Sequence, residues 1–491
     1  MVCGLLRASK KNPQEESAPK KILDLQMKCF LFGGIRASDS ISSSSRKLLA
    51  FNVYTALTVI MYIPSLAGQA AALYLESDDV AELTAIAFPV IAGYLHFFIS
   101  SYLLLNRKPL EQLILRTEEC FEECRNRLPL RREHNLIIDD ATKKIRKYSW
   151  IFIITNIVTW FLWMSLPLVF RLNHYINAEK SLAQNETETD DKIHWEFVCY
   201  KMWLPRAVYQ EPYYYLVWAY QAILIGILLV DNTGYNSAYY ALMIYTAAHF
   251  KVVATLIEDI DRYIMSPYST KNPEQSLILS DMKNENHLQE GKSFGKEIVL
   301  KNSGFNGIGN NVETSQLDEY RSLNTEDITA NILQAEDYLV NCVKYHQALL
   351  GYVDDVGGLF SNLLFIFFSL NGALMCITVF QTTVVSGGTG SFKFLGAMIT
   401  VWVPMFLICW FGELLTEQSE AVERAIYGCK WFNASERFKK YVQFIIMRSQ
   451  KVVRLTAGHF FAVSLEGFAN IANTVYAYYT ILKQAQEPTS E

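Results

Sequence analysis

Long stretches without a charged residue are the feature that most constrains what this chain can fold into. Asp, Glu, Lys and Arg are all absent from residues 48–75, 83–106, 148–170, 212–230, 232–250, 356–392 and 394–412. A membrane-spanning helix needs about 20 consecutive, mostly apolar residues, and several of these stretches exceed that length. Soluble helices would need a polar face, which the stretches lack. The sequence therefore predicts an all-α membrane protein embedded in a lipid bilayer.

Composition and charge narrow the class further. Hydrophobic residues make up 51% of the chain and charged residues 19%, below the roughly 25% of globular domains. The net charge of −5 and the lack of a basic domain indicate no nucleic-acid partner. Residues 1–47 are polar and basic and show no cleavable signal peptide, so the first apolar helix is expected to act as the insertion signal.

Seven transmembrane helices are expected. Their approximate ranges are 48–75, 80–105, 147–171, a fourth starting near 212, 356–382, 391–415 and 457–483. These helices divide the chain into an N-terminal segment (1–47), helices one to four (48–250), an extension (251–355), helices five and six (356–416), a second extension (417–456) and helix seven with the C-terminus (457–491).

The distribution of Lys and Arg predicts the orientation, because cytoplasmic loops retain these residues. Segments 1–47, 106–147, 251–355 and 413–456 hold 37 of the 44 Lys and Arg residues. The N-terminus is therefore expected inside and the C-terminus outside. The glycosylation sequon at Asn185 would then lie outside and could carry a glycan, whereas that at Asn433 would lie inside and stay bare.

The two longer extensions are expected to differ in order. Residues 266–328 are rich in Asn, Ser, Gly, Glu and Lys without an apolar period, which predicts disorder. Helix four is expected to continue to 250, roughly 57 Å from residue 213, and to project into the cytoplasm. Segments 329–350 and 417–450 are amphipathic. These pieces form either a cytoplasmic anchor bundle that holds subunits together or solvated helical linkers.

Enzymatic function is not indicated. The eight histidines are scattered without an i, i+4 pair, and no phosphate-binding loop, nucleophile elbow or metal-ligand pattern is present, so neither a cofactor nor a metal is expected. G-protein-coupled receptors are excluded by their opposite orientation, and helix seven reads Asn-Thr-Val-Tyr from Asn473 in place of Asn-Pro-x-x-Tyr.

Helix seven is the most polar of the seven. At helical spacing, one stripe holds Asn470, Asn473, Thr474, Ala477 and Ile481. Polar side chains facing lipid are costly, so this stripe should line water or pack on protein. A polar stripe that ends on an aliphatic residue is what a pore with a dewetting gate needs. Close helix packing through small residues remains an equal alternative.

The outer parts of helices two, three, four and six are aromatic and uncharged. Such walls suit small, neutral, hydrophobic ligands, although interfacial aromatic belts place Trp and Tyr at the same depth. The candidate ligand-binding residues are Phe88, Ile91, Ala92, Leu95, Thr159, Trp160, Trp163, Met164, Tyr215, Trp218, Ala222, Met398, Val401 and Trp402.

The C-terminal third resembles the insect odorant receptor family. The order and spacing of its segments carry the resemblance: Gly412–Val422, Arg448–Lys451, Arg454–Gly458, Phe460–Glu466 and Tyr478–Leu482. The resemblance implies a tetrameric, odorant-gated, non-selective cation channel in the plasma membrane of sensory dendrites. It also implies that each subunit contributes helix seven to the pore, with the gate at Ile481 beside Thr480, and that a small volatile organic ligand binds among the outer helices.

Two features bear on which kind of family member this is. The insertion at 266–328 resembles in length and place that of the shared co-receptor, whereas the Tyr-Ala-Tyr-Tyr-Thr-Ile-Leu ending at 476–482 resembles ligand-tuned receptors. The favoured interpretation is a tuned receptor that forms a heterotetramer with a co-receptor; a homotetramer stays open. The final-helix pattern of gustatory receptors is not matched, since Val475 follows Thr474 and Ala485 follows Gln484.

Overall fold

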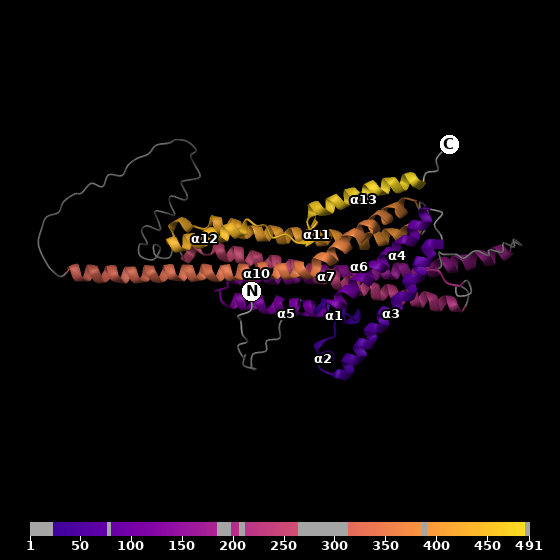
Figure 1. Cartoon of the computed structure of the whole chain (residues 1–491), viewed down its shortest axis with the longest axis horizontal. Coiled ribbons are helices and arrows are strands. Elements are labelled where there is room, and N and C mark those ends of the chain that lie inside the picture. Colours follow the sequence, from indigo (N-terminus) through magenta and orange to yellow (C-terminus); the bar gives the residue numbers. More distant parts are fainter. Residues whose placement is uncertain are drawn as a thin grey trace.

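The computed structural model describes residues 23–75, 80–183, 198–205, 212–263, 313–384 and 390–486, which are almost entirely helical. Most helices run along the long axis of the molecule (Figure 1). The elements are α1 (Asp24–Phe32), α2 (Asp39–Ser42), α3 (Ser45–Leu75), α4 (Val80–Leu105), α5 (Arg107–Asn126), α6 (Arg132–Ala183), α7 (Tyr213–Glu258), α10 (Glu313–Val384), α11 (Gly390–Gly428), η4 (Trp431–Asn433), α12 (Glu436–Ser449), β1 (Thr456–Ala457), β2 (Phe461–Ala462) and α13 (Leu465–Gln486).

In the part of the chain that the structure describes, six helices are long and apolar enough to cross a membrane: α3, α4, α6, α7, α10 and α11. Large apolar side chains are exposed along α3 and α6, among them Leu57, Ile60 and Phe161, as expected of surfaces that face lipid. The seventh predicted span, α13, has 22 residues and is about 33 Å long, enough to cross a bilayer, but it is not among the helices that are apolar enough to do so.

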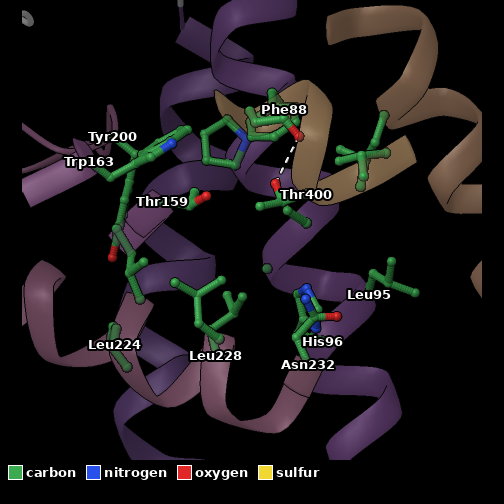
Figure 2. A pocket seen from close by; sticks show the side chains of 18 of the residues that line it. Phe88, Leu95, His96, Thr159, Trp163, Tyr200, Leu224, Leu228, Asn232 and Thr400 are labelled. Atoms are coloured by element: carbon green, nitrogen blue, oxygen red, sulfur yellow. Dashed lines mark hydrogen bonds between the residues drawn. The ribbon is translucent and has the colours of Figure 1, made fainter. Parts of the chain in front are cut away.

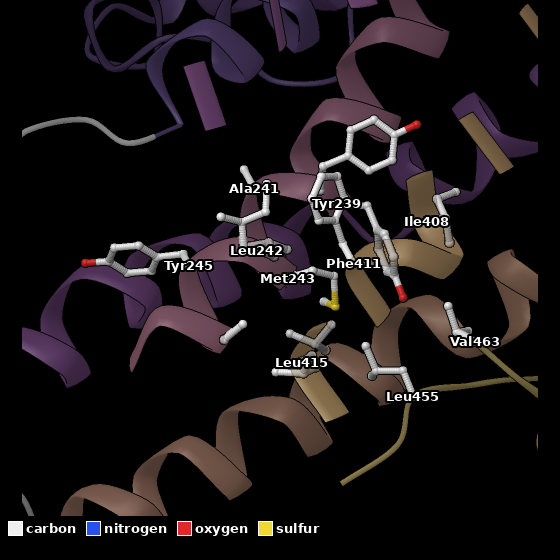
Figure 3. Close-up of a cluster of buried hydrophobic side chains, with 14 of the residues drawn as sticks. Tyr239, Ala241, Leu242, Met243, Tyr245, Ile408, Phe411, Leu415, Leu455 and Val463 are labelled. Atoms are coloured by element: carbon white, nitrogen blue, oxygen red, sulfur yellow. The ribbon is translucent and has the colours of Figure 1, made fainter. Parts of the chain in front are cut away.

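Helix α7 is the central element of the fold. Every residue from Asp231 to Phe250 is buried, and α7 packs closely against α11 and α6. Figure 3 shows part of this core, in which Tyr239 and Met243 of α7 face Ile408 and Leu415 of α11. A helix without a charged face has to be covered on all sides. The charge-free run 232–250 meets this requirement, because protein surrounds this part of α7. The predicted continuation beyond residue 250 is present, since α7 ends only at Glu258.

The segments beyond the spans are helical as well. Helix α10 has 72 residues and is about 108 Å long, and it contains the amphipathic segment 329–350. Because α10 begins at Glu313, residues 313–328 are helical, although the whole segment 266–328 was expected to be disordered. These residues extend a helix that is stabilised by packing further along the chain. Residues 264–312 lie outside the described part of the chain. Segment 417–450 is not one helix, because α11 ends at Gly428 and α12 starts after Ser435.

The prediction of helix seven is wrong at its start. Residues 456–462 form a short antiparallel hairpin, with Thr456 opposite Ala462, and the helix begins only at Leu465. The turn holds Gly458 and His459 at φ values of +60° and +64°, which an α-helix does not allow. The hairpin is fixed to α10, because the Gly458 N–H donates to the Ser361 carbonyl at 2.9 Å.

Candidate functional site

A cavity of about 120 Å³ lies among α3, α4, α6, α7, α10 and α11 (Figure 2). An engineered cavity of about 150 Å³ in another protein holds benzene, so this volume suits a molecule of about that size. The lining residues from α3 and α4 are Tyr62, Ser65, Leu66, Gln69, Phe88, Pro89, Ala92, Gly93, Leu95 and His96. The other helices and the 198–205 segment contribute Thr159, Trp163, Tyr200, Leu224, Ile225, Leu228, Leu229, Asn232, Tyr235, Phe367, Asn371, Leu374, Ala397, Thr400, Val401 and Pro404.

Aromatic rings form one wall of the cavity. Phe88 of α4 stacks on Trp163 of α6 with ring centroids 6.0 Å apart, and Phe394 of α11 meets Phe88 edge-on at 6.0 Å. The Lys393 ammonium lies 4.6 Å from the centroid of the Trp163 ring, a cation–π contact. Rings held by three helices in this way give a rigid surface that can bind apolar molecules by shape and dispersion.

The segment 198–205 covers the cavity at one end. The Tyr200 hydroxyl lies 2.8 Å from that of Ser65, and the Gln221 amide donates to the Tyr200 carbonyl at 2.9 Å. The Lys393 ammonium donates to the Cys199 carbonyl at 2.6 Å, so α11 also holds the segment. Burial raises the pKa of the Cys199 thiol to about 12, so this thiol stays neutral and unreactive. Contacts from α3, α7 and α11 therefore fix this cover in place.

The cavity brings together six of the predicted ligand-binding residues: Phe88, Ala92, Leu95, Thr159, Trp163 and Val401. The other eight lie nearby with different surroundings. Ile91 and Met398 are half-buried, Met164 and Ala222 are buried, and Tyr215 is exposed. Three tryptophans bind neighbouring protein groups: Trp160 donates to the Ala222 carbonyl, Trp218 donates to that of Met164, and Trp402 packs on Phe468 of α13.

Helix α3 contributes to the cavity, which the sequence analysis did not foresee. Tyr62, Ser65 and Gln69 occupy one face of α3, and all three are buried. An amide such as Gln69 in the middle of a largely apolar span is costly when it faces lipid, so it indicates a protein-facing or ligand-facing position. That signal was present in the charge-free run 48–75.

The predicted pore stripe lies on the outer side of α13. Asn470, Asn473, Thr474, Ala477 and Ile481 are exposed in the single chain and Thr480 is half-buried. The opposite face packs inward, with Val475 only 4% exposed. Asn470, Thr474 and Ile481 also border a groove between α13 and α10, lined on α10 by Phe368, Gly372 and Cys376. One face of α13 is therefore available to neighbouring subunits or to water.

Other predicted features lie outside this site or outside the described residues. Asn185 falls in the part of the chain that is not described. Among the described residues, no group of three His, Cys, Asp or Glu side chains could hold a metal ion.

Residues 79–476 match the family model described as 7tm Odorant receptor. The chain is 30% identical to the odorant receptor coreceptor of Harpegnathos saltator over 143 residues, a match that spans only 30% of that protein and 29% of this chain. It is 21% identical to the coreceptor of Aedes aegypti over 374 residues, covering 70% of this chain and 73% of that protein.

The fold is similar to a solved structure of the insect olfactory receptor OR5 from Machilis hrabei in complex with eugenol. The TM-score is 0.67 at 15% identity, and the superposition covers 94% of this chain and 98% of that one. A second structure of the same receptor gives a TM-score of 0.65.

Proposed function

Because this chain belongs to the odorant receptor family, a family of receptors and channels and not of enzymes, we propose that it is a subunit of an odorant-gated, non-selective cation channel. A small volatile organic ligand binds in the cavity among α3, α4, α6, α7, α10 and α11. Binding opens a pore that is lined by α13, closed at Ile481 and shared by four subunits around one axis.

The observation that carries this proposal is the path from the cavity to α13. On α11, Val401 lines the cavity while the next residue, Trp402, packs edge-on against Phe468 of α13, with ring centroids 6.3 Å apart. On α10, Leu374 lines the cavity while Cys376 borders the groove beneath α13. A ligand that favours one arrangement of α10 and α11 therefore also favours one position of α13, as a ligand-driven shift between two states requires.

The proposed assembly is a heterotetramer with an odorant receptor co-receptor in the plasma membrane of sensory dendrites, with the N-terminus cytoplasmic and α10, α11 and α12 contributing to an intracellular anchor. The homology to both odorant receptors and coreceptors supports partnering of this kind. The exposed stripe on α13 carries no Asp or Glu, so the pore passes cations with little discrimination.

Voltage clamp of cells that express the chain with and without a co-receptor tests the proposal. A panel of small volatiles should evoke inward cation current in at least one condition. Ile481→Ser should leak current at rest or shift the ion selectivity, because a polar residue wets an aliphatic constriction. A chain that reaches the surface but gives no current in either condition contradicts the proposal. If Ile481→Ser lowers expression and changes neither the resting current nor the ion selectivity, Ile481 is not the gate.

A second candidate is a co-receptor-type subunit that forms a homotetramer. The observation that favours it is that the chain is similar to odorant receptor coreceptors, at 30% and 29% identity over 143 residues. A homotetramer predicts odour-evoked or constitutive current from the chain alone, whereas the heterotetramer predicts current only with the co-receptor.

A further inference from the structure

A second hollow lies on the outside of the helix bundle, between α3 and the end of α4. It is an open groove of about 470 Å³, lined by Asn52, Thr55, Ala56, Val59, Ile60, Leu104 and Arg107. Its residues on α3 extend from Asn52 to Ile60, about 12 Å along the helix. None of these residues lines the cavity described above, so the groove is separate from the candidate ligand site.

The groove is on a part of the surface that faces lipid. Val53, Leu57 and Ile60 of α3 are 51–57% exposed, and apolar side chains at that exposure indicate contact with a membrane. In Figure 1, α3 and α13 lie on opposite sides of the molecule, so the groove is far from the proposed pore axis. The acyl chain of a phospholipid can therefore reach it.

One end of the groove is positively charged. Arg107 is the first residue of α5, and its guanidinium carbon lies 5.6 Å from the centroid of the Phe51 ring. Arg107 Nε lies 3.6 Å from a carboxylate oxygen of Glu111, and the same oxygen lies 3.6 Å from Arg36 Nε. Because one carboxylate is shared by two guanidinium groups, a net positive charge remains at this end.

Further cations surround the same end of the groove. Arg46 and Lys47 at the start of α3 and Lys108 at the start of α5 are exposed, and none of the three forms an ion pair with another described residue. With the N-terminus inside, as proposed, this end lies at the cytoplasmic leaflet, whose lipids carry negative charge. The groove and that leaflet are therefore complementary in charge.

We propose that the groove binds one anionic phospholipid of the cytoplasmic leaflet. An acyl chain lies along Ala56, Ile60 and Leu104, and the phosphate is bound by Arg107 with a hydrogen bond from the Asn52 amide. The N–H groups of an Arg side chain match the oxygens of a phosphate. The Arg107 side chain is only 26% exposed, so its contact with a phosphate is screened less by water than that of a fully exposed cation.

Binding to the purified full-length protein in detergent micelles tests the inference. Three additives are compared: phosphatidylserine, phosphatidylcholine with the same acyl chains, and glycerophosphoserine, which has the headgroup without the chains. The rise in unfolding temperature with additive concentration measures binding. Phosphatidylserine should bind about five- to thirtyfold more tightly than phosphatidylcholine, the effect of one or two cations near an anionic lipid. Glycerophosphoserine should not stabilise the protein.

Two groove variants should each weaken the binding of phosphatidylserine at least about fivefold. Arg107→Gln removes the charge at the polar end, and Ala56→Trp fills the apolar part of the groove. Lys440→Gln is the control for charge, because Lys440 is an exposed cation on α12, outside the groove. Leu57→Trp is the control for bulk, because Leu57 is exposed beside Ala56 but does not line the groove. Both controls should bind phosphatidylserine as the parent does.

Several outcomes would overturn the inference. These are equal binding of the two phospholipids, equal stabilisation by glycerophosphoserine, and a preference for phosphatidylserine that survives both groove variants. Loss of the assembled oligomer in Ala56→Trp with an unchanged lipid preference would assign the groove to a second copy of the chain and overturn it as well. The measurement needs neither odorant nor current, so its result is independent of whether the chain is an odorant-gated channel.

Discussion

Two neighbouring residues of α11 face different functional parts of the protein. Val401 lines the cavity, whereas Trp402 packs on Phe468 of α13. Consecutive helical residues point about 100° apart, so α11 can line the cavity and contact α13 at the same level. The two side chains should therefore have separable roles in binding and in gating.

Substitution of each residue tests that separation. Val401→Ala enlarges the cavity, and we expect the preference to shift toward larger volatiles with little change in maximal current. Trp402→Leu leaves the cavity lining intact but removes one of the two described ring contacts that α11 makes with Phe468 of α13, the other being from Phe406. We expect the maximal current to fall several-fold with the order of ligand preference unchanged. Concentration–response curves at matched surface expression measure both; a shifted ligand order in Trp402→Leu would show that the two roles are not separate.

Gly458 sits at the hairpin turn in a conformation that other residues resist. Its φ is +60°, and a Cβ there would lie 2.8 Å from the Phe365 ring on α10. We expect Gly458→Ala to destabilise the protein by about 1–2 kcal/mol from the backbone alone, with the ring clash in addition. Thermal unfolding of the purified protein measures this loss of stability. Gly351→Ala is the control, because a Cβ at that helical position meets nothing within 4 Å, so its stability should hold or rise.

At the level of secondary-structure elements, the sequence predicts the spans well because absence of charge is a strong signal. Helix α4 matches its predicted range, and α3 starts only three residues before its prediction. The hairpin before α13 was missed, because Thr456–Ala462 is apolar enough to continue a helix and only the backbone at Gly458 and His459 rules that out. The amphipathic segment 417–450 was predicted without the break between α11 and α12, which follows Gly428, a residue type that ends helices readily.

Neighbouring residues that were predicted to bind ligand face different ways in the structure. Phe88, Thr159 and Trp163 line the cavity, while Trp160, one residue from Thr159, donates to the Ala222 carbonyl. The depth of a residue follows from its distance to the helix end, which the sequence supplies. The direction in which it faces depends on how six helices pack, and an apolar run contains too little polar pattern to specify that packing.

The cap of α12 links two elements of the proposed anchor. The Ser435 hydroxyl accepts from the Phe438 N–H at 3.1 Å and donates to the Glu336 carboxylate of α10 at 2.6 Å. Ser435→Ala removes both bonds, and we expect a loss of about 1–2 kcal/mol of stability. Thermal unfolding measures the loss of stability, and native gels measure the fraction of assembled tetramer. Ser43→Ala is the control and should leave stability unchanged, because Ser43 is exposed and donates to the nearby Ser40 carbonyl. If Ser435→Ala is as stable as the parent, the cap does not stabilise the contact between α12 and α10.

At the scale of the whole molecule, the uneven placement of Lys and Arg predicts an N-terminus inside and a C-terminus outside. It predicts that Asn185 is glycosylated in cells and that Asn433 is not. Enzymatic removal of N-glycans should increase gel mobility for the parent chain and for Asn433→Gln, but not for Asn185→Gln. A mobility change that is lost in Asn433→Gln instead would reverse the orientation.

The channel mechanism requires that the exposed face of α13 meets water at an axis shared by the subunits. Thr474 and Ala477 lie on that face with Ile481, whereas Val475, next to Thr474, is buried against the rest of the chain. Thr474→Cys, Ala477→Cys and Ile481→Cys should react with a charged, water-soluble thiol reagent in the activated channel and block its current. Val475→Cys is the matched control and should react far more slowly. The parent gives the background rate, since five of its described cysteines are buried and Cys29 is half-buried. Equal slow reaction at all four positions would mean that α13 packs against its neighbours without lining a pore, and the conduction path would then have to lie elsewhere in the assembly.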